Sequence, residues 1–232
     1  MKIAVMQPYF FPYIGYWQLI NAVDKFVIFD DVNYINRGWI NRNKILNTDG
    51  SQYFNILLKS RSQNKKINET ELNNDARYIK KNLKKISFIY GKAPYYSMVY
   101  PVLEQILTNR ELNLSKYLYF NIECICDYLN ITTELLLSSE ISNTDNRTGQ
   151  DRIINIVKKC NADTYINAIG GADLYSRYFF QENKINLFFL KTNNIEYKQF
   201  NNIFVPNLSI IDVMMFNSVD EIKSLLNRYE LL

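Results

Sequence analysis

The stretch KIAVMQPYFFPYIGYWQLINAVDKFVIFDD, residues 2–31, predicts the architecture of the chain. Residues 2–6 and 25–29 are short apolar runs of the kind that form buried strands, and residues 16–23 favour a short helix between them. A strand, helix and strand within about 30 residues have the length of a parallel crossover. We therefore expect a parallel sheet, whose ligands bind beyond the carboxyl ends of its strands.

The rest of the chain turns helical and then returns to alternating strands and helices. Further strands are predicted at residues 52–58, 132–138, 164–168 and 185–190. Helices are predicted at residues 77–90, 94–108, 115–129 and 148–160, around Tyr175, and near the C-terminus. This order predicts an α/β fold with a mostly parallel sheet flanked by helices. We expect one domain over residues 1–232, with a helical insertion at about 70–130.

Three capping boxes are expected to start helices, each a Ser or Thr followed three residues later by an acid. They are Thr148-x-x-Asp151, Ser209-x-x-Asp212 and Ser218-x-x-Glu221. A capping role explains these three acids without any catalytic function.

The composition excludes several classes of chemistry. The chain has 232 residues, no histidine and three cysteines. Ser-His-Asp and Cys-His catalysis and His-ligated zinc are therefore excluded, and the cysteines are too few for a four-cysteine zinc site. No apolar run approaches the roughly 18 residues of a membrane span, and the N-terminus lacks the layout of a signal peptide. We expect no membrane span and a cytoplasmic location.

Positive charge is concentrated in the first part of the chain. Residues 1–92 hold 15 Lys and Arg against 7 Asp and Glu, whereas residues 93–232 hold 12 against 16. This excess suits a ligand that carries phosphate. The basic segment 77–92 suits a phosphate-rich partner such as tRNA or lipid headgroups, but a solvated helix face is favoured because aromatic residues do not interleave with its cations. Specific DNA binding is not expected.

The segment from Gln7 to Trp17 is unusually aromatic, since six of the nine residues from Tyr9 to Trp17 are Tyr, Phe or Trp. A loop between a buried strand and a helix does not need such density. The rings are candidates for a stacking wall against a base or sugar ring. The alternative is that they close the top of the hydrophobic core.

The second candidate segment starts with the adjacent carboxylates Asp30 and Asp31. Two carboxylates at a strand end could bind a metal or act as a base and its orienting partner, although alternation along the strand lets only one face the site. Arg37 and Arg42 could clamp a diphosphate through paired hydrogen bonds. Lys59, at the end of the strand predicted at 52–58, is placed to reach the same crevice. A solvated, salt-bridged loop is the alternative.

Gly170 and Gly171 follow a predicted strand and precede a helical stretch. Glycines there would let a ligand approach the backbone, although the pattern matches neither of the common phosphate-binding loops. A plain turn is the alternative.

Two long segments resemble the WbqC-like family of bacterial proteins. They are QPYFFPYIGYWQLI from Gln7 and FDDVNYINRGWINRN from Phe29, and shorter pieces at 92–96, 170–175, 197–199 and 206–212 are also similar. The resemblance implies a role in O-antigen or other surface-polysaccharide biosynthesis. It also implies a transferase or ligase that attaches glycine or a related acyl group to the amine of a sugar. The family residues present here are Gln7, Pro8, Tyr9, Pro12, Tyr13, Gly15, Asp30, Asp31, Tyr34, Arg37, Trp39, Asn41, Arg42, Ser209 and Asp212.

The chain departs from the family pattern around 193–197 and 214–218, where relatives often carry a His-Pro and a Gly. If that histidine is catalytic in relatives, this chain is inactive or uses another base. The opening loop also resembles that of nucleotidylyltransferases and pantoate–β-alanine ligases, without their two histidines. That similarity favours an ATP-dependent, adenylate-forming enzyme, at the level of fold analogy.

The leading hypothesis is acyl transfer to a nucleotide-linked amino sugar, with glycine, a charged tRNA or an acyl carrier as the donor. The predicted catalytic residues are Asp30, Asp31 and Lys59. The predicted substrate-binding residues are Gln7, Tyr9, Tyr13, Tyr34, Arg37, Trp39, Asn41, Arg42, Gly170 and Gly171. No metal-binding set is identified, and ATP with Mg²⁺ is the candidate cofactor. The alternative is a non-catalytic module that binds a sugar nucleotide or glycan in a polysaccharide assembly complex.

Overall fold

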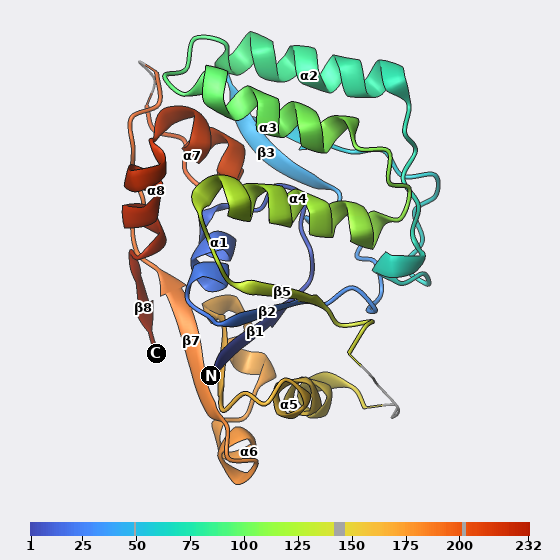
Figure 1. Cartoon of the computed structure of the whole chain (residues 1–232), viewed down its shortest axis with the longest axis vertical. Helices are drawn as coiled ribbons and strands as arrows, with labels where there is room; N and C mark the ends of the chain where they lie inside the picture. Colours follow the sequence, from blue (N-terminus) through green and yellow to red (C-terminus); the bar gives the residue numbers. More distant parts are fainter. Residues whose placement is uncertain (49, 142–146, 201–202) are drawn as a thin grey trace.

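The computed structural model describes residues 1–48, 50–141, 147–200 and 203–232. Its main sheet has six strands in the order β5-β2-β1-β6-β7-β8 (Figure 1). The strands are β1 (Lys2–Met6), β2 (Lys25–Ile28), β5 (Glu134–Leu137), β6 (Thr164–Ala168), β7 (Asn186–Thr192) and β8 (Tyr229–Leu231). The first five are parallel, and β8 runs antiparallel to β7. Counted along the chain within this sheet, the order is 3-2-1-4-5-6, that of doubly wound folds. The predicted α/β fold is confirmed.

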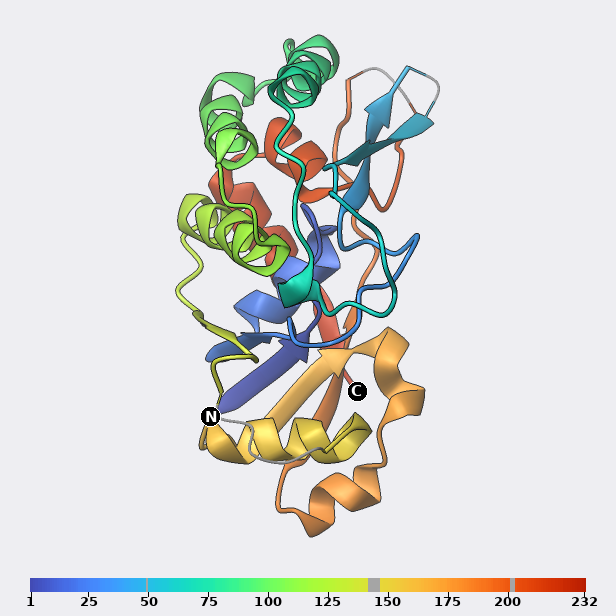
Figure 2. The same ribbon diagram turned by 90° about the vertical axis from the view of Figure 1, so that its right-hand side faces the viewer.

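Alternation along the central strands divides the core into two layers. Ile3 and Val5 of β1 belong to one buried cluster, and Ala4 between them belongs to the other. One face of the sheet is covered by α1 (Ile14–Asn21), α4 (Leu114–Leu129) and α8 (Val219–Leu226), and α7 (Ile210–Phe216) packs farther out against α8 and β3. The opposite face is covered by α5 (Gly149–Lys159) and α6 (Arg177–Glu182), as Figures 1 and 2 show. Burial on both faces explains why these strands read as continuous apolar runs.

The middle of the chain is helical, as predicted. It contains the short 3₁₀ helix η1 (Ile67–Glu69), α2 (Ala76–Tyr90), α3 (Tyr96–Thr108) and α4. None of the helices within the described residues combines the length and the apolar character needed to cross a membrane.

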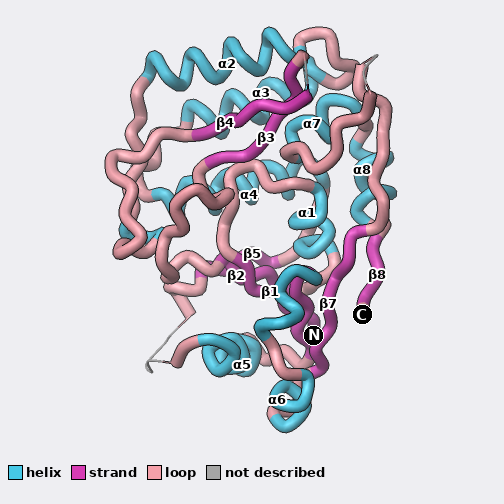
Figure 3. Tube along the Cα trace, turned by 180° about the vertical axis from the view of Figure 1, so that it is seen from behind, coloured by secondary structure: helices cyan, strands magenta, loops and turns pink. Residues whose placement is uncertain are grey.

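The prediction of a third sheet strand at residues 52–58 was wrong. The strand there is β4 (Gly50–Asn55), and it pairs antiparallel with β3 (Arg42–Asn47) as a separate two-stranded hairpin (Figure 3). β3 and β8 were not predicted. The hairpin strands are rich in polar residues, RNKILN and GSQYFN, and lack the apolar run that marks a central strand buried on both faces. Buried Asn43 of β3 donates to the carbonyl of Phe11 at 2.8 Å, so the hairpin braces the aromatic loop.

One of the three predicted capping boxes forms. Ser218 Oγ accepts from the backbone N–H of Glu221 at 3.2 Å, and the Glu221 carboxylate accepts from that of Ser218 at 2.7 Å. Ser209 caps α7, but Asp212 turns into the core and is fully buried. Thr148 stands at the start of α5 without a side-chain cap hydrogen bond. The helix starts were therefore predicted correctly, but the capping role of Asp212 was wrong.

Candidate functional site

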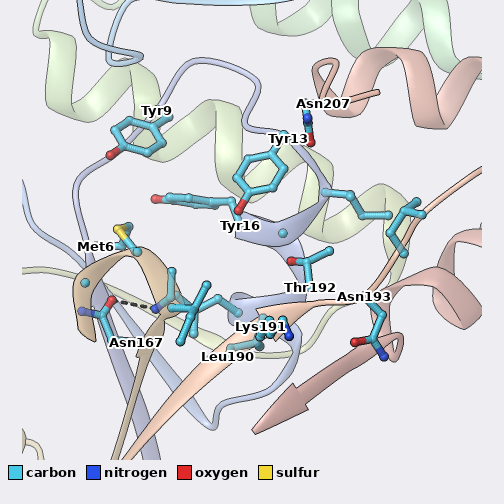
Figure 4. A pocket seen from close by; sticks show the side chains of 18 of the residues that line it. Met6, Tyr9, Tyr13, Tyr16, Asn167, Leu190, Lys191, Thr192, Asn193 and Asn207 are labelled. Carbon is cyan, nitrogen blue, oxygen red and sulfur yellow. Dashed lines mark hydrogen bonds between the residues drawn. The ribbon is translucent and has the colours of Figure 1, made fainter. Parts of the chain in front are cut away.

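A cavity of about 900 Å³ opens at the carboxyl ends of β1, β6 and β7 (Figure 4). The chain winds outward from β1 through β2 to β5, and then from β6 through β7 to β8 on the other side. The reversal between the adjacent strands β1 and β6 is the switch point where open parallel sheets bind ligands. The cavity is also of the size usual for small-molecule sites.

The first wall comes from the loop after β1 and the start of α1. Gln7, Tyr9, Tyr13 and Tyr16 line it, and Figure 4 shows the three tyrosines together on one side. The Tyr16 hydroxyl donates to the carbonyl of Gln7 at 3.0 Å, and the Tyr9 and Tyr16 rings are 5.6 Å apart between centroids. A Cβ at Gly15 would lie 2.5 Å from the Tyr13 hydroxyl oxygen, so a larger residue there would displace the Tyr13 ring.

The aromatic segment serves both of the roles considered for it. Phe10, Phe11 and Trp17 are fully buried and close the core, whereas Tyr9 and Tyr13 face the cavity. Burial raises the pKa of both cavity tyrosines, so they are neutral phenols at neutral pH. They can stack against a ring and exchange hydrogen bonds with a ligand.

The second wall follows β6. Asn167 and the glycine pair line it, the glycines within the 3₁₀ helix η2 (Ile169–Leu174). Asn167 Oδ1 accepts from the backbone N–H of Ala168 at 2.8 Å, the dashed line in Figure 4. A Cβ at Gly171 would lie 2.7 Å from Asn167 Nδ2, whereas one at Gly170 would meet nothing within 4 Å. A side chain at Gly171 would therefore clash with Asn167, whereas Gly170 leaves open space beside the backbone.

The third wall runs from the end of β7 toward α7, through Lys191, Thr192, Tyr197 and Asn207. Among the described residues that line the cavity, Lys191 is the one with a charged side chain. Tyrosines and carboxamides supply most of the other polar groups. The sequence predictions missed Asn167, Lys191 and Thr192, which stand in no distinctive pattern. They also missed Tyr197, which lies in the family-like segment 197–199 but was given no role.

Asp212 fixes the back of this third wall. Its carboxylate accepts hydrogen bonds from Tyr90 at 2.9 Å, from Tyr197 at 2.7 Å and from Gln199 Nε2 at 2.6 Å. Burial raises the pKa of Asp212, and the three hydrogen bonds oppose that shift. Since Tyr197 lines the cavity, the buried carboxylate holds a cavity residue in place.

Asp30 lies outside the cavity lining, with 1% of its surface exposed. It accepts from the hydroxyls of Ser115 and Ser138 at 2.8 and 3.0 Å. It also accepts from the backbone N–H and the hydroxyl of Ser139 at 2.9 and 2.8 Å. These bonds tie β2 to α4 and to the chain after β5.

Asp31 flanks the cavity without lining it. Its carboxylate pairs with Arg152 of α5 and accepts from the hydroxyl of Ser138. The Arg152 guanidinium lies 4.6 Å from the centroid of the Phe29 ring, and Phe29 lines the cavity. Asp31 is therefore connected to a cavity-lining side chain through Arg152.

Lys59 does not reach the cavity, because the strand before it belongs to the hairpin and not to the main sheet. Its ammonium pairs with Glu71 at 2.6 Å on the surface, and this pair lowers the pKa of the Glu71 carboxyl.

The other predicted residues between 34 and 42 also lie outside the cavity lining. Tyr34 donates to Asn41 Oδ1 at 2.8 Å, and both side chains are buried. Arg37, Trp39 and Arg42 are on the loop before the hairpin and at its start. The structure thus brings together five predicted residues at the cavity, Gln7, Tyr9, Tyr13, Gly170 and Gly171. Within the described part of the chain, no three His, Cys, Asp or Glu side chains are grouped to hold a metal ion.

These features define a doubly wound α/β protein with an aromatic, carboxamide-lined cavity at its switch point. The chain belongs to the WbqC-like protein family, whose model matches residues 7–224. It is 30% identical over 219 residues to "Uncharacterized protein Rv1507c" of Mycobacterium tuberculosis (strain ATCC 25618 / H37Rv), with 93% of each chain covered. No solved structure matches the chain significantly.

Proposed function

We propose that the cavity binds a nucleotide-linked amino sugar and that the protein attaches glycine or a related acyl group to the sugar amine. The observation that carries the binding is the lining itself, at the switch point of a parallel sheet. Neutral tyrosines suit stacking against a base or sugar ring, and carboxamides suit hydrogen bonds to hydroxyls and base edges. Lys191 is the candidate partner of the diphosphate. The reaction class rests on the family resemblance, which implies a role in surface-polysaccharide biosynthesis.

In this reaction the sugar amine, once free of its extra proton, attacks an activated carboxyl carbon. A C–N bond forms and the donor's leaving group departs. The proton needs a base, and Asp31 is the better placed of the two predicted aspartates, because Asp30 is saturated with hydrogen bonds. The donor is ATP with glycine, a charged tRNA or an acyl carrier. ATP with Mg²⁺ belongs to the first of these routes.

The binding proposal is tested by a thermal-shift panel of dTDP-, UDP- and GDP-linked amino sugars, ATP with and without Mg²⁺, and glycine. A ligand at 100 times its Kd stabilises a protein by about 2.7 kcal/mol, which raises the melting temperature measurably. A shift with a sugar nucleotide supports the proposal, and mass spectrometry then tests each donor for an acylated product. A shift with ATP alone favours an adenylate-forming enzyme, and no shift with any sugar nucleotide contradicts the proposal.

The base assignment is tested separately with Asp31→Asn. We expect turnover to be lost while the thermal shift with the sugar nucleotide persists, because Asp31 is outside the cavity lining. Lys59→Gln is the companion variant. Loss of turnover in this variant would support the predicted catalytic role of Lys59, although its side chain lies outside the cavity lining. Unchanged turnover in both Asp31→Asn and Asp30→Asn would remove the aspartates from the mechanism.

One observation favours a second candidate, a non-catalytic module that binds a sugar nucleotide. Within the described residues, no carboxylate lines the cavity, so the lining alone offers no ordinary general base. Binding of a sugar nucleotide without product from any of the three donors would favour the module.

A further inference from the structure

Two of the predicted ligand residues that lie away from the cavity, Trp39 and Arg42, belong to a separate surface on the hairpin. This hairpin surface consists of Trp39, Arg42, Lys44 and Tyr53. Trp39 and Tyr53 are 41% and 48% exposed, and their ring centroids are 6.5 Å apart. The Arg42 guanidinium lies 4.5 Å from the centroid of the Tyr53 ring, and Lys44 Nζ lies 5.9 Å from it. None of the four lines the cavity.

Strand register explains why these side chains meet. Lys44 pairs with Tyr53 across the hairpin and Arg42 with Asn55, so these strand residues point to one face. The intervening residues Asn43, Ile45 and Phe54 point to the other face and are buried. The hairpin therefore packs one face on the core and presents cations and a ring on the other.

Arg42 is held in place by the loop before the hairpin. Its Nε donates to the carbonyl of Gly38 at 3.0 Å, and a terminal nitrogen donates to the carbonyl of Arg37. Arg37 itself adopts φ = 60°, which turns the loop back toward the strand. A guanidinium fixed over an aromatic ring is pre-organised for stacking and for contact with an anion.

The surroundings of the surface are positively charged. Between residues 32 and 68 the chain has seven cationic residues and one acid, Asp49. The cations are Arg37, Arg42, Lys44, Lys59, Arg61, Lys65 and Lys66. Among the described residues, no carboxylate forms a salt bridge with Arg37, Arg42, Lys44 or Arg61, whereas Lys59 is paired. This charge is available to a polyanion.

The neighbouring helix α2 carries a positively charged face of its own. The Tyr78 hydroxyl, near the start of α2, donates to Asn55 Oδ1 at 2.9 Å and so joins the helix to β4. Phe88 is 86% exposed, and at about 100° per residue it lies on the same face as Lys81, Lys84 and Lys85. The expectation that aromatic residues are absent from this cationic face was wrong.

We propose that the hairpin surface binds single-stranded nucleic acid. Exposed rings that bases can stack on, set among cations that contact phosphates, are the two components of such surfaces. A membrane surface is less well matched, because the outward hairpin face carries Arg42, Lys44, Ser51, Tyr53 and Asn55 and its one aliphatic side chain, Leu46, is buried. This proposal is independent of the sugar-nucleotide cavity.

The test is fluorescence anisotropy of the full chain with labelled 12-nucleotide RNA and DNA oligomers at 50 and 200 mM salt. We expect binding that weakens with salt, and at least about a fivefold rise in Kd for Trp39→Ala and for Tyr53→Ala. Tyr178→Ala is the matched aromatic control, because Tyr178 is 69% exposed on α6. The effect of charge is tested by comparing the Kd of Lys44→Gln with that of Lys2→Gln. Lys2 is an exposed lysine at the start of β1, so its variant is the matched control.

Comparison of the RNA and DNA arms identifies the source of the ligand, and binding of either supports the proposal if the Trp39 and Tyr53 variants weaken it. Unfolding curves for each variant separate loss of binding from loss of structure. Absence of binding overturns the proposal, as does equal weakening by Tyr178→Ala. Binding to phosphatidylglycerol vesicles but not to oligomers, lost in the Tyr53 variant, would overturn it and identify a membrane surface. The thermal shift with sugar nucleotides should be unchanged in every one of these variants.

Discussion

The carboxyl edge of the main sheet has two halves, one filled by side chains of the protein and one open as a cavity. Beyond β2 and β5 the edge is filled, because the buried carboxylate of Asp30 accepts hydrogen bonds from Ser115, Ser138 and Ser139. Beyond β1, β6 and β7 the edge is open and forms the cavity. The same sheet thus places a closed polar network and an open site side by side.

The difference teaches how to interpret polar residues at strand ends. A buried carboxylate must be satisfied by hydrogen bonds, and at Asp30 the protein supplies these bonds itself. A ligand site requires space and polar groups that the protein leaves accessible. The residues after β6 provide this with Gly170, beside which a Cβ would meet open space. Both halves therefore have polar residues at strand ends, but only the open half has space for a ligand.

The largest expected effect is on the closed half. Asp30→Ala removes the acceptor of three serine residues in a site that is 1% exposed, and it should destabilise the protein by about 3–5 kcal/mol. Urea unfolding measures this loss. Asp220→Ala is the control, because the Asp220 side chain is 95% exposed and should contribute under about 1 kcal/mol. A variant at Asp30 that keeps full stability but loses turnover would make Asp30 a catalytic residue and end the contrast.

The next effect concerns the open half. Tyr13→Ala removes a ring that is 38% exposed, so stability should change little while affinity for the sugar nucleotide falls about tenfold or more. Calorimetric titration measures the affinity. Tyr178→Ala on α6 removes an exposed ring remote from the cavity lining and should leave the affinity unchanged. Equal affinities for the Tyr13 variant and wild type would place the ligand elsewhere.

Much of the fold could be predicted from the sequence, because the parallel strands are buried on both faces and read as apolar runs. The hairpin strand β3 could not, since RNKILN opens with three polar residues and has no apolar run, and its partner was assigned to the main sheet. At the cavity, the Gln7 loop was recognisable by its aromatic density. Lys191 was not, because it reaches the cavity through the winding of the sheet and has no local signature, and the family-like segment that contains Tyr197 did not indicate its role. The capping motif at Ser209 likewise concealed that Asp212 is buried.

The third effect is a pH dependence behind the open half. Burial raises the pKa of Asp212, so folding favours its protonated form, and this contribution is complete below the usual pKa of 3.8 and lost as pH rises through the raised pKa. The stability of wild type relative to Asp212→Asn should therefore grow as pH falls from 7.5 toward 3.5. The growth should be about 1.4 kcal/mol for each pH unit that separates the usual pKa from the raised one. Urea unfolding across this range measures it.

Glu221 provides the control of opposite sign. Hydrogen bonds from the Ser218 backbone and side chain lower the pKa of Glu221, so its contribution is present above the usual pKa of 4.5 and lost as pH falls. The advantage of wild type over Glu221→Gln should therefore stay nearly constant above the usual pKa of 4.5 and shrink below it, whereas that over Asp212→Asn grows as pH falls. Parallel trends for the two variants would refute the assignment at Asp212.

The smallest effects separate the two glycines of the open half. Gly170→Ala adds a methyl group to open space and should leave stability within about 0.5 kcal/mol of wild type, whereas Gly171→Ala must displace the Asn167 carboxamide and should cost about 1 kcal/mol. Both should weaken sugar-nucleotide binding, the first by narrowing the approach to the backbone and the second by moving a lining amide. Unfolding and titration of the two variants distinguish these causes. If neither variant alters binding, the ligand does not use the wall after β6, and the open half is defined by the tyrosines alone.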